Sequence, residues 1–296
     1  MPEILHLETE EVEPSSETVI HPSIQETLPS SWLQHSGEGI KVAVIDTGYS
    51  DHANLNGAYS KTLSVMGDTG LDILGHGSHV AGIIGARGYV KNGLTGFAPG
   101  CEIISIKAVP GTWASLSNAM EMAIDEGVDI INLSCGANFP PGSYFMGLVN
   151  DAVDRGTIIV ASAGNVKISG KNTLNYPAKL ENIIPVAAIT QNMETAPFSA
   201  TGSELNDGYC MPGIQVYSTW LHQRYAKCSG TSMAAPQLTG LIARILGKHL
   251  IDQGSTPIPD KGRRRLEAVL SHLDYASRNL GDPMVFGKGY IDASKL

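Results

Sequence analysis

Short apolar runs alternate with helical segments through the middle of the chain, and few folds accommodate such an alternation. Three helices are predicted at 75–85, 115–126 and 145–155. The apolar runs around them are residues 41–45, 102–108, 129–133, 157–161 and 183–188. Strands that alternate with helices pair in parallel, and right-handed crossovers place the helices against the sheet. We therefore predict one α/β domain, in which helices flank a central, mostly parallel β-sheet on both faces.

The two ends of the chain differ from this middle part. Towards the C-terminus, two short β segments and two helices are predicted, at 215–219, 224–228, 233–246 and 264–273. Residues 1–22 are acidic and interrupted by prolines, and few of them can join a core. We expect these residues to form an N-terminal extension that is mobile by itself, followed by a globular domain over 23–296.

Charge and composition exclude several classes of protein. A net charge of −9 and a single strongly basic run, at 263–265, argue against nucleic-acid binding. No stretch approaches the roughly 18 apolar residues of a membrane span, and the first residues lack a signal-peptide pattern. The four cysteines show neither CxxC spacing nor the density of a disulfide scaffold; they are Cys101, Cys135, Cys210 and Cys228. We expect free thiols in a cytoplasmic protein.

Three residue types that acyl transfer requires lie in small-residue settings. Asp46 ends the first predicted strand, His76 lies in a glycine-rich segment, and Ser232 precedes a predicted helix. A serine becomes nucleophilic when a histidine takes its proton, and a carboxylate orients that histidine and stabilises its charged form. The first N–H groups of a helix lack partners, so the helix start at Ser232 can hold an oxyanion. Taken singly, each residue also has a structural role available: Ser232 as an N-cap, Asp46 as a strand-end cap and His76 as a core histidine.

Longer motifs contain these three residues. They are Val44-Ile-Asp-Thr-Gly48, Gly75-His-Gly-Ser-His-Val-Ala-Gly82 and Gly230-Thr-Ser-Met-Ala-Ala-Pro236. In this order they resemble the signature motifs of the subtilisin-like serine proteases, and the resemblance covers about residues 23–296. It implies an endopeptidase in which Asp46 orients His76, His76 is general base and then general acid, and Ser232 forms the acyl-enzyme. By the same resemblance, Asn165 and the Ser232 backbone N–H stabilise the oxyanion.

The resemblance also implies how a substrate binds. Two segments pair with an extended substrate backbone from opposite sides, as added β-strands do; they are Ser134-Cys135-Gly136 and Gly111-Thr112-Trp113. Ala163 and Gly164 line the first pocket, and Trp113 either gates a second apolar pocket or is a packing aromatic. Val166 stands where many relatives carry glutamate at the pocket rim. We therefore expect apolar residues before the cut.

No cofactor is expected to be required. Relatives often hold calcium through a carboxylate after the catalytic aspartate and an asparagine-bearing loop after the histidine helix. Asn54 and Val90 occupy these places here, so the oxygen ligands that calcium prefers are depleted. Backbone carbonyls near Tyr176 leave a weak calcium site open. His76 and His79 are spaced like zinc ligands, but no carboxylate or thiol pattern accompanies them, and no metal is predicted.

Several functional alternatives remain open. Secreted relatives carry a signal peptide and a pro-domain, and because neither is visible here, the organisation resembles that of the intracellular subtilisins. The expected partner is a peptide or protein substrate, with no nucleic acid or membrane and with the oligomeric state undetermined. A general peptidase, a dedicated leader-peptide processing protease and a non-catalytic pseudoprotease are all compatible with this pattern. The extension, with its apolar run at 4–7, either covers the cleft as a tethered inhibitor or is a solvated tail.

Overall fold

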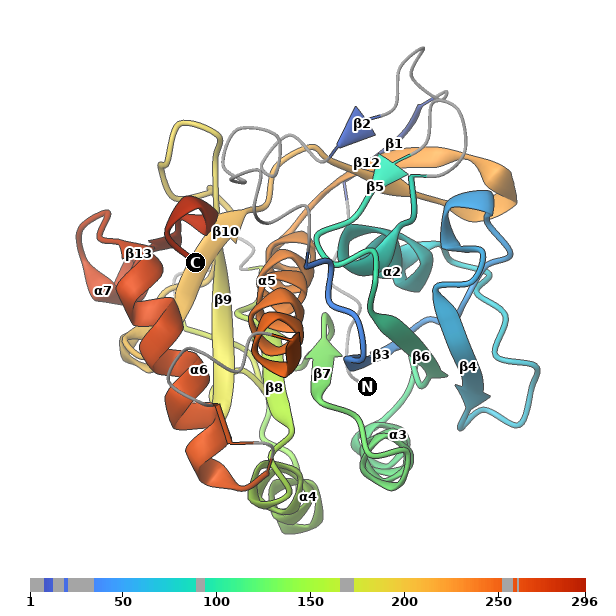
Figure 1. Ribbon diagram of the computed structural model, residues 1–296, viewed down its shortest axis with the longest axis horizontal. Helices are drawn as coiled ribbons and strands as arrows, with labels where there is room; N and C mark the ends of the chain where they lie inside the picture. The colour runs from blue at the N-terminus through green and yellow to red at the C-terminus, as the bar shows by residue number, and fades with distance from the viewer. Residues whose placement is uncertain are drawn as a thin grey trace.

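A nine-stranded sheet forms the centre of the computed structural model, which describes residues 8–12, 19–20, 35–88, 94–165, 173–251, 258–259 and 261–296. In spatial order its strands are β13 (Ser277–Arg278), β14 (Tyr290–Ile291), β10 (Tyr209–Pro212), β9 (Ile183–Ile189), β8 (Ile158–Ser162), β7 (Ile130–Leu133), β3 (Lys41–Asp46), β6 (Glu102–Lys107) and β4 (Tyr59–Ser64). Neighbouring strands pair in parallel, except β13 with β14. The predicted parallel sheet is confirmed (Figure 1).

Helices cover this sheet in two groups. Their bounds are α2 (His76–Gly85), α3 (Trp113–Asp125), α4 (Ser143–Asp154), α5 (Thr231–Ile251), α6 (Arg263–Ala276) and α7 (Pro283–Phe286). Helices α2 and α5 pack against each other, whereas α4 contacts both α3 and α6 (Figure 1). Every residue of β7, β8 and β9 is buried, as expected for parallel strands covered on both faces. The apolar runs of the sequence therefore form the inner strands of the sheet. Helix α5 begins two residues earlier than predicted and ends later.

Four strands of the sheet were not predicted, namely β4, β10, β13 and β14, and the last two are only two residues long. Strand β4 (YSKTLS) lies at the edge of the sheet and is only partly buried, so its sequence lacks an apolar run. Strand β10 (YCMP) is short and ends in Pro212. Short 3₁₀ helices occur in the connections, at Ala53–Leu55, Ser203–Leu205, Leu221–Gln223 and Ala293–Lys295. Among the helices in the described ranges, none combines the length and apolar character needed to cross a bilayer.

Two stretches of the N-terminal extension form strands. β1 (Glu8–Val12) pairs antiparallel with β12 (Tyr225–Ser229), which in turn pairs with β11 (Val216–Thr219). β2 (Val19–Ile20) pairs in parallel with β5 (Leu94–Thr95). β11 pairs with one edge of β12, and β1 pairs with the other edge, which would otherwise have unpaired backbone groups. These two stretches of the extension are therefore paired with the globular domain, and the rest of residues 1–22 lies outside the described residues.

Candidate active site

The predicted catalytic and binding residues meet at one edge of the sheet. Asp46 is the last residue of β3, Ser134 follows β7, and Ala163 to Asn165 follow β8. These three strands are parallel neighbours in the sheet, so their carboxyl ends reach the same edge. In open α/β sheets, sites form beyond this edge. The fold therefore brings together residues that lie more than a hundred positions apart.

Asp46 and His76 form a buried pair. His76 Nδ1 lies 2.6 Å from Asp46 Oδ1, and the two side chains are 3% and 1% exposed. The Thr47 N–H also donates to Asp46 Oδ1, at 2.7 Å, which fixes the carboxylate. Since Nδ1 donates its proton to the carboxylate, the neutral ring presents Nε2 as an acceptor. His76 therefore has the orientation that a general base needs.

The charge balance around His76 favours its protonated form. Burial disfavours the imidazolium, but the Asp46 carboxylate, its hydrogen bond and the Asp72 carboxylate outweigh burial, so the pKa of His76 is raised.

Gly75, directly before the helix, has φ 91° and lies against the Trp220 ring. An added Cβ at Gly75 would come within 2.4 Å of this ring, so only glycine fits there. The start of α2, and with it His76, is held in a fixed place.

Ser232 is the second residue of α5 and is joined to Ser134 by two hydrogen bonds. Its Oγ donates to the Ser134 carbonyl oxygen at 3.0 Å, and Ser134 Oγ donates to the Ser232 carbonyl oxygen at 3.0 Å. In the described part of the chain, His76 Nε2 is buried without a hydrogen-bond partner. The expected contact between the Ser232 hydroxyl and His76 is thus not formed, because the hydroxyl is bonded to a carbonyl instead. Rotation about the Ser232 Cα–Cβ bond redirects Oγ, and catalytic hydrogen bonds commonly tighten only when substrate binds.

Asn165 is oriented by the residue before the nucleophile. Its Oδ1 accepts hydrogen bonds from the Thr231 N–H and the Thr231 hydroxyl, both at 2.9 Å. Thr231 Oγ1 in turn accepts from the Gly164 N–H at 3.1 Å. The oxygen end of the amide is therefore occupied, which leaves Nδ2 as the donor end. The Ser232 N–H, in the first turn of α5, is a second donor without an acceptor inside the helix.

The predicted substrate segments differ in how the structure places them. Ser134 is held by a hydrogen bond from Asn132 Nδ2, and Gly136 lies against the Tyr176 carbonyl oxygen, at which an added Cβ would clash. The Cys135 side chain is 2% exposed and points towards the Ile45 carbonyl, so only its backbone can meet a substrate. Burial, with a smaller effect of the Asp46 charge, raises the pKa of this thiol well above its usual range.

The segment Gly111-Thr112-Trp113 is not the second strand that was predicted. Trp113 is the first residue of α3, and Thr112 is its N-cap, whose hydroxyl accepts from the Ser115 N–H. A chain that turns into a helix here has at most Gly111 and Thr112 left to pair with a substrate. The Trp113 ring packs at 5.1 Å from Phe145 and edge-on at 6.3 Å from Phe139. The segment begins a helix because Thr112 caps it. A threonine three residues before Ser115 was the sequence pattern from which this helix start could have been predicted.

The first pocket contains a residue that the sequence did not reveal. Ala163 is fully buried and its carbonyl accepts from the Asn175 N–H at 2.8 Å. The Asn175 side chain lies against Gly164, where an added Cβ would come within 2.8 Å of its Cγ. Asn175 therefore borders the predicted pocket walls. Val166 lies outside the described residues.

Asn54, at the expected calcium position, is hydrogen-bonded within the protein. Asn54 Oδ1 accepts from the Leu94 N–H at 3.1 Å and from the Tyr225 hydroxyl, and Asn54 Nδ2 donates to the Arg87 carbonyl at 3.1 Å. Both ends of the Asn54 side-chain amide are therefore occupied by protein groups. Val90 is outside the described residues. The Tyr176 carbonyl, expected at a weaker site, accepts from the Ala137 N–H.

No group of three or more His, Cys, Asp or Glu residues suited to a metal occurs in the described ranges. His79 Nε2 lies 3.0 and 3.1 Å from the Val216 and Ala226 carbonyl oxygens, which makes it a hydrogen-bond donor to the sheet beside α2. Its role here is structural.

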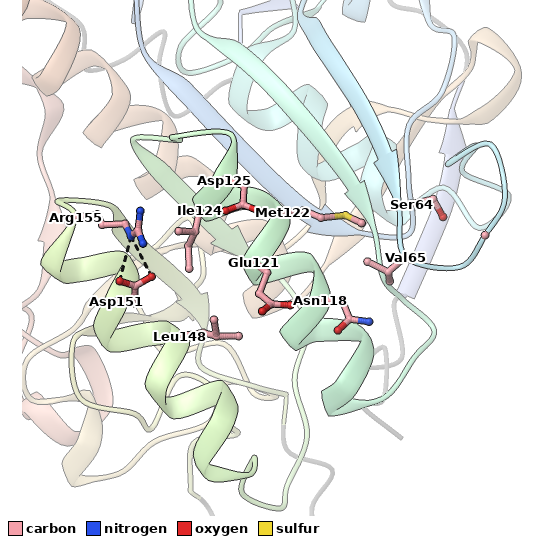
Figure 2. Close-up of a pocket in the computed structure, with 11 residues that line it drawn as sticks. Ser64, Val65, Asn118, Glu121, Met122, Ile124, Asp125, Leu148, Asp151 and Arg155 are labelled. Carbon is pink, nitrogen blue, oxygen red and sulfur yellow. Dashed lines mark hydrogen bonds and ion pairs between the residues drawn. The ribbon is translucent and has the colours of Figure 1, made fainter.

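A groove elsewhere on the molecule is separate from this site. It has a volume of about 650 Å³ and lies between α3, α4 and the end of β4 (Figure 2). Three acidic side chains line it, and one of them, Asp151, pairs with Arg155 at 3.0 Å. None of the predicted catalytic residues lines this groove.

The placement of Asp46, His76, Ser232 and Asn165 at the edge of a parallel sheet is compatible with a hydrolase that uses a serine nucleophile. The model of the subtilase family, peptidase S8, matches residues 37–272. The chain is 35% identical over 265 residues to subtilisin DY from Bacillus licheniformis, which covers 87% of this chain and 90% of the relative. It is 33% identical over 262 residues to subtilisin Savinase from Lederbergia lenta, with the same shares covered. It is 36% identical over 267 residues to subtilisin E from Bacillus subtilis, covering 87% of this chain and 65% of the relative.

The chain therefore belongs to the subtilase family and is a serine endopeptidase.

Proposed function

We propose that this endopeptidase cleaves peptide bonds through Ser232, with His76 as base and Asp46 as its partner. The observation that carries the proposal is the Asp46–His76 pair at 2.6 Å, which leaves the buried Nε2 without a partner among the described residues. His76 takes the Ser232 proton as Oγ attacks the peptide carbonyl, and then gives it to the leaving amine. Asn165 Nδ2 and the Ser232 N–H stabilise the oxyanion. Water then releases the acyl group from Ser232, with His76 again as base. Replacement of Ser232 or His76 by alanine tests these roles.

The preference for apolar residues before the cut is the second part of the proposal. Phe139, three residues after Gly136, is 42% exposed, and its ring packs against Trp113, which in turn contacts Phe145. Exposed aromatic surface beside an extended peptide favours apolar side chains.

Phe139→Ala is expected to lower kcat/KM about 10-fold for peptides with an apolar residue several positions before the cut, because the contact is lost. Peptides with serine there are expected to change less. Tyr275→Ala, at a 76% exposed position on α6, is the matched control. An equal loss for both peptides would contradict this preference.

The N-terminal extension, over residues 1–22, restrains the enzyme in this proposal. Glu8 is paired with Ser229, three residues before Ser232. β1 and β12 are antiparallel. The residues before Glu8 therefore continue in the same direction as the residues that lead from Ser229 to Ser232. His76 and Ser232 are also only 3% and 2% exposed, which agrees with an occluded cleft. A tethered segment has an effective concentration on the order of millimolar, so a weak contact is enough to compete with substrate.

Deletion of residues 2–20 is expected to raise kcat/KM for a small peptide several-fold, because the tethered competitor is removed. The free segment added as a peptide should reverse the rise. A variant with 2–20 replaced by a Gly/Ser linker of equal length is the control for chain length, and it should behave like the deletion. Unchanged kcat/KM in both variants would rule out restraint by the extension.

The cytoplasmic location is proposed on the cysteines. All four are free and buried, with no disulfide among them, which suits a reducing compartment. Recovery of the native protein outside the cytoplasm on cell fractionation would contradict this location.

A further inference from the structure

Asp72 is a buried carboxylate that binds the start of the catalytic helix. It is 3% exposed and lies four residues before His76. Its Oδ1 accepts from the Leu74 and Gly75 N–H groups at 2.9 and 2.8 Å. Its Oδ2 accepts from the N–H and the hydroxyl of Ser78, at 2.9 and 2.6 Å. Asp72 therefore satisfies backbone donors on both sides of His76, where the first turn of α2 has no acceptors of its own.

A threonine connects Asp72 to the other half of the catalytic pair. The Thr47 hydroxyl donates to Asp72 Oδ1 at 2.8 Å and accepts from the Gly77 N–H at 2.7 Å. Thr47 follows Asp46, and Gly77 follows His76. One side chain thus bonds the end of β3 to the start of α2 at the residues next to the pair. The distance between Asp46 and His76 depends on this bridge, which includes Asp72.

Asp72 also lacks a cationic partner within the described residues. The ammonium group of Lys107, at the end of β6, bonds to the Leu71 carbonyl and to Asp68. Other titratable residues near the site include Asp46 on β3, Tyr49 after β3, Tyr59 on β4, Cys135 after β7 and His79 on α2. Burial together with the charges of Asp72 and Asp46 raises the pKa of Tyr59 far above its usual range, and Cys135 is likewise neutral. His76 is therefore the group whose positive charge the Asp72 carboxylate favours.

We propose that Asp72 is a positioning residue for catalysis, which fixes His76 against Asp46 and stabilises the imidazolium that forms when His76 takes the Ser232 proton. This inference rests on the roles proposed above for His76 and Ser232. It adds a second carboxylate to the site, one that acts through His76 and touches neither the substrate nor Ser232 in the described contacts.

The pH dependence of kcat/KM reports the charge effect. In the wild type, only neutral His76 can act as base, so kcat/KM is expected to rise with pH through a midpoint above 6.5, the ordinary value for histidine. Asp72→Asn keeps the size of the side chain but removes the charge and one of the two acceptor oxygens, so the midpoint is expected to move to lower pH. The same variant should lower kcat about 10- to 100-fold with KM nearly unchanged, because His76 is misplaced while substrate contacts remain.

Two further variants make the test decisive. Thr47→Val removes the bridge but keeps the charge, so kcat should fall several-fold while the midpoint stays in place. Asp68→Asn is the matched control, since Asp68 is an exposed carboxylate of the same loop bonded to Lys107, and kcat and midpoint should stay those of the wild type.

A folded Asp72→Asn enzyme with wild-type kcat and midpoint would overturn the proposal. If Asp72→Asn does not fold, wild-type kcat in Thr47→Val would overturn it. Ser232→Ala distinguishes failure of the proposed catalytic roles from failure of the Asp72 proposal. Retained turnover in Ser232→Ala would refute the catalytic roles. Loss of turnover in Ser232→Ala, together with wild-type kcat and midpoint in Asp72→Asn, would refute the Asp72 proposal alone.

Discussion

Ser232→Ala is expected to lower kcat for peptide hydrolysis by about 10⁶-fold, a magnitude known from subtilisin, to which this chain is similar. His76→Ala should lower it to a similar degree, because a serine hydroxyl without its base is a poor nucleophile. The double variant should be little worse than either single one, since the two residues act in one proton transfer. Steady-state kinetics with a peptide substrate measure all three.

Ser271→Ala, on the exposed face of α6, is the matched control for the serine substitution and should retain wild-type turnover. Losses that add up in the double variant would mean that Ser232 and His76 act independently. That outcome would contradict the proposed proton transfer.

Asn165→Ala is expected to lower kcat by about 10²–10³-fold with little change in KM, a range measured for the corresponding asparagine in subtilisin. The physical reason is that Nδ2 donates to charge that develops only in the transition state. Asn165 also holds Thr231 through Oδ1, so the alanine variant removes a structural bond as well.

Asn165→Asp separates these two effects. It keeps an oxygen acceptor for Thr231 and replaces the Nδ2 donor with a negatively charged oxygen, so kcat should fall at least as far as in Asn165→Ala. Asn192→Ala, at an exposed turn, is the control for loss of an asparagine. Wild-type kcat in Asn165→Asp would contradict the oxyanion role.

The sequence predicted the inner part of the fold because burial on both faces requires continuous apolar runs. Strands β3, β7, β8 and β9 are such runs, and each was predicted within a few residues. Strand β4 is half-exposed and mostly polar, so it left no comparable run. Strand β1 depends on pairing with β12, more than two hundred residues away, and its own acidic sequence gives no sign of that partner.

The candidate site shows the same division. The motifs around Asp46, His76 and Ser232 predicted the residues to which we assign the chemistry, and the structure joins Asp46 to His76. Three features depended on contacts that short motifs do not encode. The Ser232 hydroxyl is bonded to Ser134, Trp113 begins a helix, and Asp72 supports His76 through side-chain hydrogen bonds to the helix start. A carboxylate four residues before the histidine was the available signal for Asp72, since acidic residues are favoured near helix N-termini.

Labelling with a fluorophosphonate tests the central claim, that Ser232 is a nucleophile activated by His76, most directly. The full chain and the variant lacking residues 2–20 are treated with the reagent, and the modified residue is identified by mass spectrometry of peptides. We expect one added phosphonyl group on Ser232, which is lost in Ser232→Ala and strongly slowed in His76→Ala. A folded protein that is unlabelled with and without the extension, or labelling that persists in Ser232→Ala, would contradict the claim.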